Sequence, residues 1–271
     1  MNVLISCRSA ARSTVVSPAA AVAGAGRWLA PSGWPAFPDE DRTRVRLLAW
    51  LAIWAQVLFV LGWIVGGLLE RGYSPVRQYT SELGRHGAAH PWIFNLVVVL
   101  WGLGFIALAI AMFPALRARP WARVAPSLFL LAGVFAIAIG PLRLDCAAAV
   151  DRICSARQHA GLLSWREYGH VWVSFGLELT LLLTPFALAR SLWPGRLARL
   201  ILTAAGAVAT LLLLFLLVGV SVGAHTHHGG PDGLWQRLWL LVVNGWVLLC
   251  AGALILDAGR HDVAQAPAPV A

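Results

Sequence analysis

The sequence contains no lysine, and charged residues of any kind are scarce. All 21 basic side chains of the 271-residue chain are arginine, and only 12% of its residues are charged, whereas a water-soluble domain carries about a quarter. The absence of lysine excludes a Schiff-base lysine and a lysine nucleophile. Because 59% of the residues are hydrophobic and 14 are Trp, the polar surface is too small to coat a soluble globule. We therefore expect a membrane protein.

The formal net charge of +9 raises the question of a nucleic-acid partner. The arginines flank apolar runs and do not form one patch. This distribution is typical of membrane topology and not of a face that docks into a nucleic-acid groove. We expect the lipid bilayer to be the partner, and we expect no nucleic acid.

Six apolar stretches have the length, about 20 residues, that is needed to cross the hydrocarbon core. Only Glu178 places a formal charge inside any of them. The pattern predicts an all-α, polytopic bundle of six transmembrane helices in the plasma membrane, and it leaves open whether the bundle forms a homo-oligomer. The expected spans are 47–69, 91–114, 124–142, 171–189, 200–224 and 238–256.

The two ends of the chain differ from the apolar runs. Residues 1–46 are rich in small residues and proline without periodicity, so we expect a disordered tail, with an over-extended start codon as the alternative. Residues 257–271 form a second expected tail. Two short links, ALRARPWAR and RSLWPGRLAR, each carry three arginines and no acid. The positive-inside rule therefore predicts cytoplasmic termini and long loops on the extracytoplasmic side.

Polar residues within the spans lean toward the side of the long loops. His170, Ser174 and Glu178 recur at i, i+4 and i+8, and Arg237 and Asn244 are seven apart, so each set shares one helix face. A carboxylate facing lipid is costly. We expect these five side chains to line a polar cavity under the first long loop. The alternative is that they form hydrogen bonds between helices.

Two cysteines, Cys146 and Cys154, lie in the third loop along the chain, which is the second of the long ones. On the extracytoplasmic side a disulfide between them would persist. The alternatives are two unpaired cysteines, or a zinc site that uses this pair with His159, although the spacing matches no recognised zinc pattern.

The first long loop contains the segment YSPVRQYTSELG, from Tyr73 to Gly84. With this motif the chain resembles the uncharacterised prokaryotic membrane proteins catalogued as domain of unknown function 998. The resemblance covers about residues 45–256 and implies a membrane architecture but no reaction. In this pattern Asp145 and His170 match, but the Phe-Pro expected before the Asp is missing. The other matching residues are Tyr73, Ser74, Pro75, Arg77, Ser81, Leu83 and Gly84 in the first motif, Asn95 and Gly102 after it, and Gly233, Gln236 and Arg237 before the last span.

Two arginines of this motif set suggest an anion site. A guanidinium binds phosphate or carboxylate through two parallel hydrogen bonds, and Arg77 and Arg237 both fall at the membrane–water boundary. Arg77 and Ser81 are spaced at i, i+4, with Glu82 beside them, which predicts one face of a short helix. The alternative is that arginine–carboxylate pairs hold the loops together.

Several functions remain open at this stage. The first is a binding protein without a cofactor, which holds a lipid headgroup or small anionic ligand in the cavity. A purely structural membrane protein is another. The candidate ligand-binding residues are Arg77, Ser81, Glu82, Asn95, Asp145, His170, Ser174, Glu178, Arg237 and Asn244.

Two further functions involve chemistry or transport. A metal-dependent intramembrane hydrolase would use a divalent ion such as zinc, with Asp145 or Glu178 as base, although HTHHGGPDG lacks the i, i+4 spacing that places two ligands on one helix face. A proton-coupled carrier would use Glu178, although inverted repeats are not visible. The metal ligands of the hydrolase would be drawn from His170, His225, His227 and His228.

Overall fold

The computed structural model describes residues 39–116, 121–193, 198–206, 209 and 230–264. All of these residues belong to one compact unit. They form helices joined by loops, and none of them is in a strand. The elements are α2 (Asp39–Leu69), the 3-10 helix η1 (Thr80–Gly84), α3 (Pro91–Leu116), α4 (Val124–Ile139), α5 (Arg152–His159), α6 (Trp165–Leu192) and α8 (Asp232–Ala264).

Four of these helices are long and apolar enough to cross a membrane. The predicted helical membrane bundle is confirmed in this coarse form. A fifth helix, α4, is apolar but shorter, and residues 198–206 are helical at the start of the span expected over 200–224, most of which lies outside the described residues. The count of six spans and the orientation of the termini stay predictions. The four spans are Asp41–Leu69, Pro91–Leu116, Trp165–Leu192 and Asp232–Leu256.

α4 ends at Ile139 and not at residue 142, whereas the other described helices are longer than the apolar stretches that predicted them. α2 begins at Asp39 and not at residue 47, and α8 continues to Ala264, so residues 39–46 and 257–264 are helical although we expected them in the tails. Hydropathy detects only the part of a helix that lies in hydrocarbon, whereas the helix itself can continue into the headgroup layer. The rest of both expected tails lies outside the described residues.

The start of α6 is set by a polar cap that hydropathy does not detect. Ser164 precedes the helix, and its hydroxyl accepts a hydrogen bond from the Glu167 amide at 3.5 Å. Ser-x-x-Glu is the pattern of a capping box. The helix therefore begins at Trp165 and not at residue 171, where the apolar run begins.

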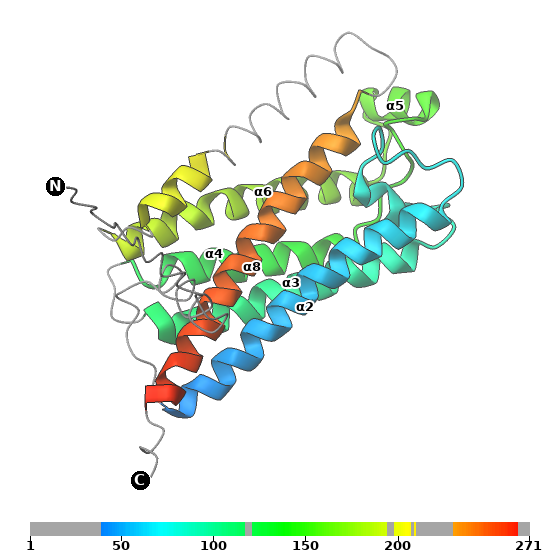
Figure 1. Cartoon of the computed structure of the whole chain (residues 1–271). Coiled ribbons are helices and arrows are strands. Elements are labelled where there is room, and N and C mark those ends of the chain that lie inside the picture. The colour runs from blue at the N-terminus through cyan, green and yellow to red at the C-terminus, as the bar shows by residue number, and fades with distance from the viewer. Residues whose placement is uncertain (1–38, 117–120, 194–197, 207–208, 210–229, 265–271) are drawn as a thin grey trace, which may run out of the picture. The chain divides into compact units, whose positions relative to one another are not determined.

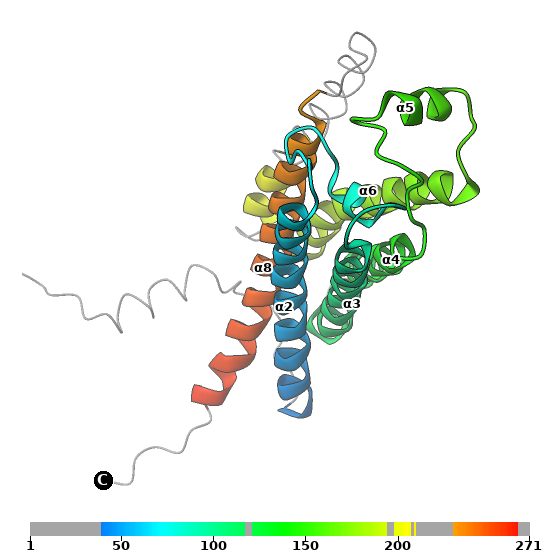
Figure 2. The same cartoon turned by 90° about the vertical axis from the view of Figure 1, so that its right-hand side faces the viewer.

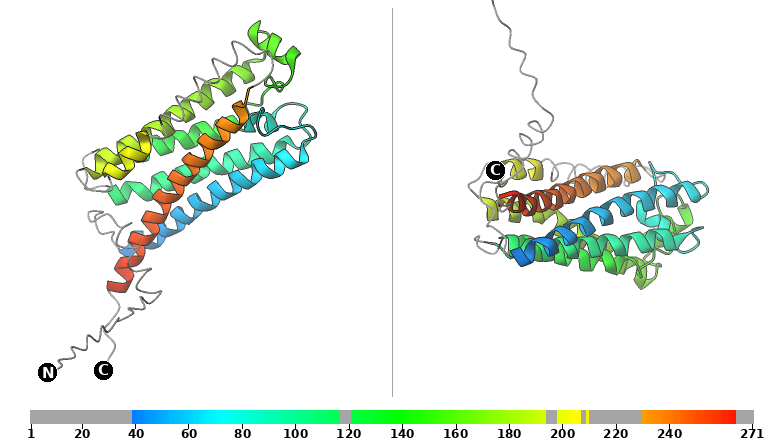
Figure 3. Two further views of the ribbon diagram at one scale, coloured as in Figure 1. Left: turned by 45° about the horizontal axis from the view of Figure 1, so that its top comes forward. Right: turned by 60° about the horizontal axis from the view of Figure 1, so that its bottom comes forward.

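The helices pack in the order α8, α2, α3, α4 and α6, each against the next, as Figures 1 and 2 show. Figure 3 shows α8 and α2 side by side from two further directions. Aromatic rings connect three of these helices. Phe59 stacks on Trp101, with 4.2 Å between the ring centroids. The ring of Phe105 lies next in the row, with its centroid 4.7 Å from that of Trp101 and 6.2 Å from that of Phe129. This aromatic row is the centre of the core.

Two glycines allow α3 and α4 to approach closely. A Cβ built on Gly102 would lie 2.6 Å from the Gly133 carbonyl oxygen, and one on Gly133 would lie 2.6 Å from the Gly102 oxygen. Small residues at such crossings are typical of helices packed within membranes.

The long loops gather at one end of the bundle, which we call the loop end. It consists of residues 70–90, which contain η1, and residues 140–164, which contain α5 (Figure 1). The His86 amide donates to the Leu144 carbonyl at 2.9 Å and joins the two loops. The loop end also contains the first turn of α8, since the Leu234 amide donates to the Val76 carbonyl at 3.0 Å.

Candidate functional site

Arg237 of α8 holds the first long loop in place. Its side chain is 5% exposed, and Nη1 donates to the carbonyls of Pro75, Gln78 and Gly233 at 2.6, 2.8 and 2.8 Å. Nη2 donates to the Tyr73 hydroxyl. The partners are thus backbone carbonyls and a phenol, and not the carboxylate that the sequence suggested. Arg237 joins the loop to α8.

Further hydrogen bonds attach the loop to α8. The Gln236 Oε1 accepts from the Thr80 amide at 2.7 Å and from its hydroxyl at 3.1 Å. The helix comes so close to the loop that a Cβ on Gly233 would collide with the Gln78 carbonyl oxygen. These contacts explain why Gly, Gln and Arg occur together in the GLWQR segment. Thr80 was missed by sequence reasoning, although it lies within the first motif.

Glu82 lies buried in η1, with 2% of its surface exposed. Its carboxylate accepts from Gln78 Nε2 at 3.0 Å and from the Ala149 amide, in the other long loop, at 3.2 Å. Burial raises the pKa of Glu82 to about 7, against these hydrogen bonds and the nearby Arg85, which lower it. Glu82 therefore changes charge near neutral pH and links both loops.

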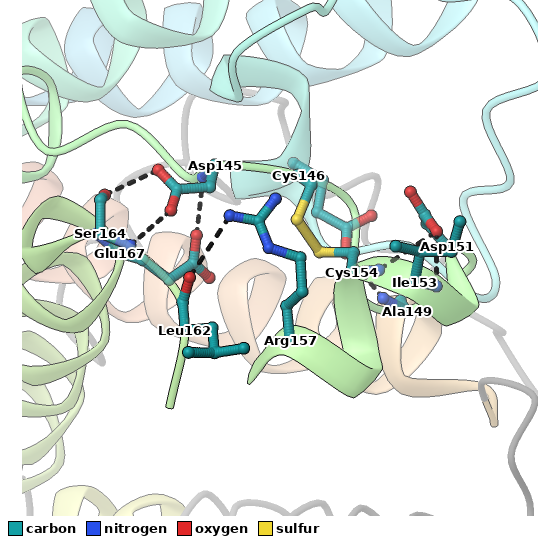
Figure 4. Close-up of a disulfide and its surroundings, with 11 residues drawn as sticks. Asp145, Cys146, Ala149, Asp151, Ile153, Cys154, Arg157, Leu162, Ser164 and Glu167 are labelled. Atoms are coloured by element: carbon teal, nitrogen blue, oxygen red, sulfur yellow. Dashed lines mark hydrogen bonds between the residues drawn. A yellow bond between two sulfur atoms is a disulfide. The ribbon is translucent and has the colours of Figure 1, made fainter. Parts of the chain in front are cut away.

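The second of these loops is held together by a disulfide and a carboxylate cap. Cys146 and Cys154 are bonded, with Cα atoms 6.0 Å apart, so their thiols are not available to bind zinc with His159. Asp145 accepts from the Ser164 amide and hydroxyl at 2.6 and 2.7 Å. Figure 4 shows the disulfide between this cap and α5.

The hydrogen bonds from Ser164 also set the charge of Asp145. Partial burial acts to raise the pKa of Asp145, but the backbone and hydroxyl hydrogen bonds from Ser164 outweigh it and lower the pKa overall. The Asp145 amide in turn donates to Glu167 Oε2 at 2.7 Å. Asp145 is therefore a charged structural group that fixes the start of α6.

The other predicted cavity residues lie in separate contacts. His170 Nδ1 donates to the Leu142 carbonyl at 2.6 Å, because the carbonyl can only accept. Asn244 is 3% exposed, and its Oδ1 accepts from the Trp101 indole at 3.0 Å, which also donates to Gln56 Oε1 at 2.6 Å. These are contacts within or between helices, as in the alternative interpretation. Of the remaining candidates, Arg77 is exposed, and Ser81, Asn95 and Ser174 are partly buried.

A cavity of about 580 Å³ lies between α6, residues 198–206 and α8. None of the predicted site residues is among the described residues that line it. Its walls are almost wholly apolar, which does not suit the charged headgroup or anion that we expected. The described lining residues are Leu181, Pro185, Ala204, Ala205, Val242, Val243, Gly245, Trp246, Leu248 and Leu249.

Three polar side chains, two at the loop end and one in α6, have no partner among the described residues. Glu178 of α6 and the Tyr79 hydroxyl make no hydrogen bond or ion pair there, and Oδ1 of Asp232, at the start of α8, is buried without a partner. Burial raises the pKa of Tyr79, and the carboxylates of Asp232, Glu82 and Glu178 raise it further. All three carboxylates therefore lie within electrostatic range of one phenol.

We call Tyr79, Glu82, Glu178 and Asp232 the acid cluster. Sequence reasoning singled out Glu82 and Glu178 but missed Tyr79 and Asp232. Tyr79 lies in the first motif, and Asp232 directly precedes the GLWQR segment. Their position next to motif residues was therefore the available signal.

The predicted metal ligands lie only partly within the described residues. Among the residues that the structure describes, no three His, Cys, Asp or Glu side chains are grouped so as to hold a metal ion. Of the predicted ligands, His225, His227 and His228 lie outside the described residues. The hydrolase hypothesis therefore stays a prediction, which elemental analysis of the purified protein would test.

Comparison with known proteins identifies the family. The family model described as "Protein of unknown function (DUF998)" matches residues 53–253. Searches of curated proteins and of solved structures found no match. Because the family match covers more than half of the chain, and because four helices have the length and composition of membrane spans, the protein is an integral membrane protein that belongs to the DUF998 family.

Proposed function

We propose that the protein binds a phospholipid headgroup at the loop end, with the acid cluster around an ammonium group and Arg77 on the phosphate. The observation that carries this proposal is that Asp232 Oδ1 is buried without a partner among the described residues, and that the half-buried side chains of Tyr79 and Glu178 make no hydrogen bond to a described residue either. Buried polar groups in folded proteins nearly always have hydrogen-bond partners. An ionisable residue within a membrane span is in addition a candidate functional group.

Other polar side chains at the loop end do have hydrogen-bond partners, unlike those three. Gln236, Glu70 and Asp145 are all engaged at the same end of the bundle. A buried donor or acceptor without a partner costs about 1–3 kcal/mol. The cluster therefore carries a stability cost that a bound ligand would remove.

The sign of the charge favours an ammonium group in the cluster. Burial raises the pKa of Tyr79, and three carboxylates raise it further through their charge. The buried Arg237 already donates to three carbonyls and a phenol. An ammonium ion donates three hydrogen bonds and compensates carboxylate charge. A ligand that is only anionic would be repelled here, so the small-anion version of our expectation is the less favoured one.

Arg77 supplies the site for the phosphate. It is exposed, two residues before Tyr79, and the Val76 carbonyl accepts from the Leu234 amide at 3.0 Å. This hydrogen bond holds Arg77 beside the start of α8, where Asp232 lies. Guanidinium groups match phosphate oxygens in geometry and charge. A headgroup with an ammonium and a phosphate fits both parts of the site.

The experiment compares Glu178→Gln and Asp232→Asn with a matched control, Glu70→Gln. The Glu70 carboxylate also lies at the loop end, but it pairs with Arg85 at 2.7 Å outside the cluster. Native mass spectrometry would measure bound phosphatidylethanolamine and phosphatidylglycerol. We expect the affinity of each cluster variant for phosphatidylethanolamine to fall about tenfold, because each loses about one hydrogen bond to a charged group. The control should bind this lipid as the wild type does. Equal retention in all three variants would refute the proposal.

A proton-coupled carrier is the second candidate, because Glu178 is a carboxyl group on a membrane-spanning helix without a partner among the described residues. Proton flux into proteoliposomes distinguishes the two functions. A carrier loses flux in Glu178→Gln and keeps it in Asp232→Asn, whereas a headgroup-binding protein shows no flux above empty vesicles in any variant.

A further inference from the structure

The segment 150–165, which contains α5 and ends at the first residue of the α6 span, exposes large apolar side chains. Ile153 is 75% exposed, Leu162 64% and Trp165 71%, and Val150 is exposed as well. Apolar groups of this size exposed together near a membrane mark an interaction surface. We call residues 150–165 the anchor segment.

The anchor segment continues the lipid-facing side of α6. Trp165 begins this helix, and exposed apolar residues then recur at the spacing of three or four that defines one helix face. An aromatic residue at the start of such a stripe is typical of the membrane–water interface. The exposed residues of the stripe are Trp165, Tyr168, Trp172, Phe175, Leu179, Leu183 and Phe186.

The chain keeps α5 close to that interface. α5 ends at His159 and α6 begins at Trp165, so the connecting residues reach at most about 20 Å when fully extended. The other side of the segment is tied down by the disulfide, in which the Cys154 side chain faces inward with 2% exposed. α5 therefore stays near the membrane surface.

The charges of the region suit a phospholipid surface. The one acid within the anchor segment, Asp151, caps α5 by accepting from the Ile153 and Cys154 amides at 2.9 and 3.2 Å. Arg157 and Arg166 are exposed, and the Arg166 guanidinium lies 5.7 Å from the centre of the Trp165 ring. Arginine beside an interfacial tryptophan can reach lipid phosphates while its stem stays on apolar surface.

We propose that the anchor segment is an interfacial anchor: Ile153, Leu162 and Trp165 insert into the headgroup layer of the leaflet at the loop end, and Arg166 binds phosphates of anionic lipids. The disulfide presents α5 to this layer at a fixed depth. The segment thereby fixes the height of the loop end relative to the bilayer. This inference is independent of the headgroup site, because it concerns different residues and a different surface.

The test uses the full chain in nanodiscs, labelled with an environment-sensitive fluorophore at one new cysteine in a background with Cys7→Ser and Cys250→Ala, which removes the two cysteines outside the disulfide. Leu162→Cys reports on the proposed anchor, and Gln158→Cys, an exposed polar position of α5, is the matched control. Quenching by nitroxide-labelled phosphatidylcholine measures contact with lipid. We expect several-fold stronger quenching at residue 162 than at residue 158.

Lipid charge and a charge variant complete the test. Adding phosphatidylglycerol should strengthen quenching at residue 162, and Arg166→Gln should reduce this gain about fivefold, the value of one arginine at an anionic surface. Equal quenching at residues 158 and 162 would overturn the proposal. A blue-shifted but unquenched label at residue 162 would also overturn it, because the segment would then pack against protein. Mass spectrometry should confirm that the Cys146–Cys154 bond is retained in both labelled proteins.

Discussion

Two groups of polar residues at the loop end differ in how fully they are satisfied. Around Arg237, both terminal guanidinium nitrogens, Gln78 and Gln236 have partners that include backbone groups, and only Nε of Arg237 is buried without one. In the acid cluster, Tyr79, Glu178 and Asp232 have none among the described residues. Both groups combine residues of the first loop and α8. The difference indicates that the first group holds the fold together and the second is kept for a ligand, and each prediction below tests that division.

The largest effect is expected for Arg237→Ala. This change removes the donor for three carbonyls and the Tyr73 hydroxyl, so we expect a loss of about 4 kcal/mol in the free energy of unfolding. Arg237→Lys should lose less, because an ammonium keeps the charge but not the planar fork. Unfolding by SDS in mixed micelles measures both variants. If Arg237→Ala loses less free energy of unfolding than Arg237→Lys, Arg237 does not hold the loop.

The second prediction concerns pH and Glu82. Its pKa is raised from 4.5 to about 7 by burial, so the folded state binds this proton more tightly than the unfolded chain does. The resulting stability is fully present below pH 4.5 and is lost as pH rises through 7, by about 3 kcal/mol at most. Unfolding measured from pH 5 to pH 8 should show this decline, and Glu82→Gln should abolish it. A wild-type protein whose stability rises over this range would contradict the prediction.

The third prediction is a loss of about 2 kcal/mol on replacing Cys146 and Cys154 together by serine, since the disulfide closes a short loop. Unfolding with and without reductant gives the comparison. Reductant should destabilise the wild type by the same amount and leave the double variant unchanged. If reductant affects both proteins equally, the effect does not come from this bond.

The smallest effect on stability is expected in the acid cluster itself. Glu178→Gln and Tyr79→Phe remove no hydrogen bond to a described residue, so each should change the free energy of unfolding by less than about 1 kcal/mol. Glu70→Gln, by contrast, breaks the pair with Arg85 and the bond from the Ala89 amide at 2.6 Å and should cost more. A large loss in Glu178→Gln would place this residue with the structural group.

The sequence predicts the main helices and some shared helix faces, but not the contacts of individual side chains. The lengths of the apolar runs predict α2, α3, α4, α6 and α8, because the bilayer sets the length of a span. Periodicity also places Asn244 and Arg237 on one helix face. It does not predict their partners: Asn244 accepts from the Trp101 indole and donates to the Leu240 carbonyl, and Arg237 donates to backbone carbonyls and the Tyr73 hydroxyl.

The reason is that periodicity defines a face but not what packs against it. Backbone carbonyls freed by the turn after Pro75 are acceptors that no sequence pattern displays. The short helix expected around Arg77 and Ser81 is a 3-10 helix that begins only at Thr80, so Arg77 lies outside it. The relation between Tyr79, Glu178 and Asp232 depends on how three elements meet, and it required the fold.

The most direct test of this account is a crystal structure grown from a lipid phase that contains phosphatidylethanolamine. The account predicts an ordered headgroup whose ammonium lies within hydrogen-bond distance of Glu178 and Asp232 and whose phosphate lies on Arg77. Side chains of the chain itself occupying that place, with Glu178, Tyr79 and Asp232 hydrogen-bonded to them, would contradict it.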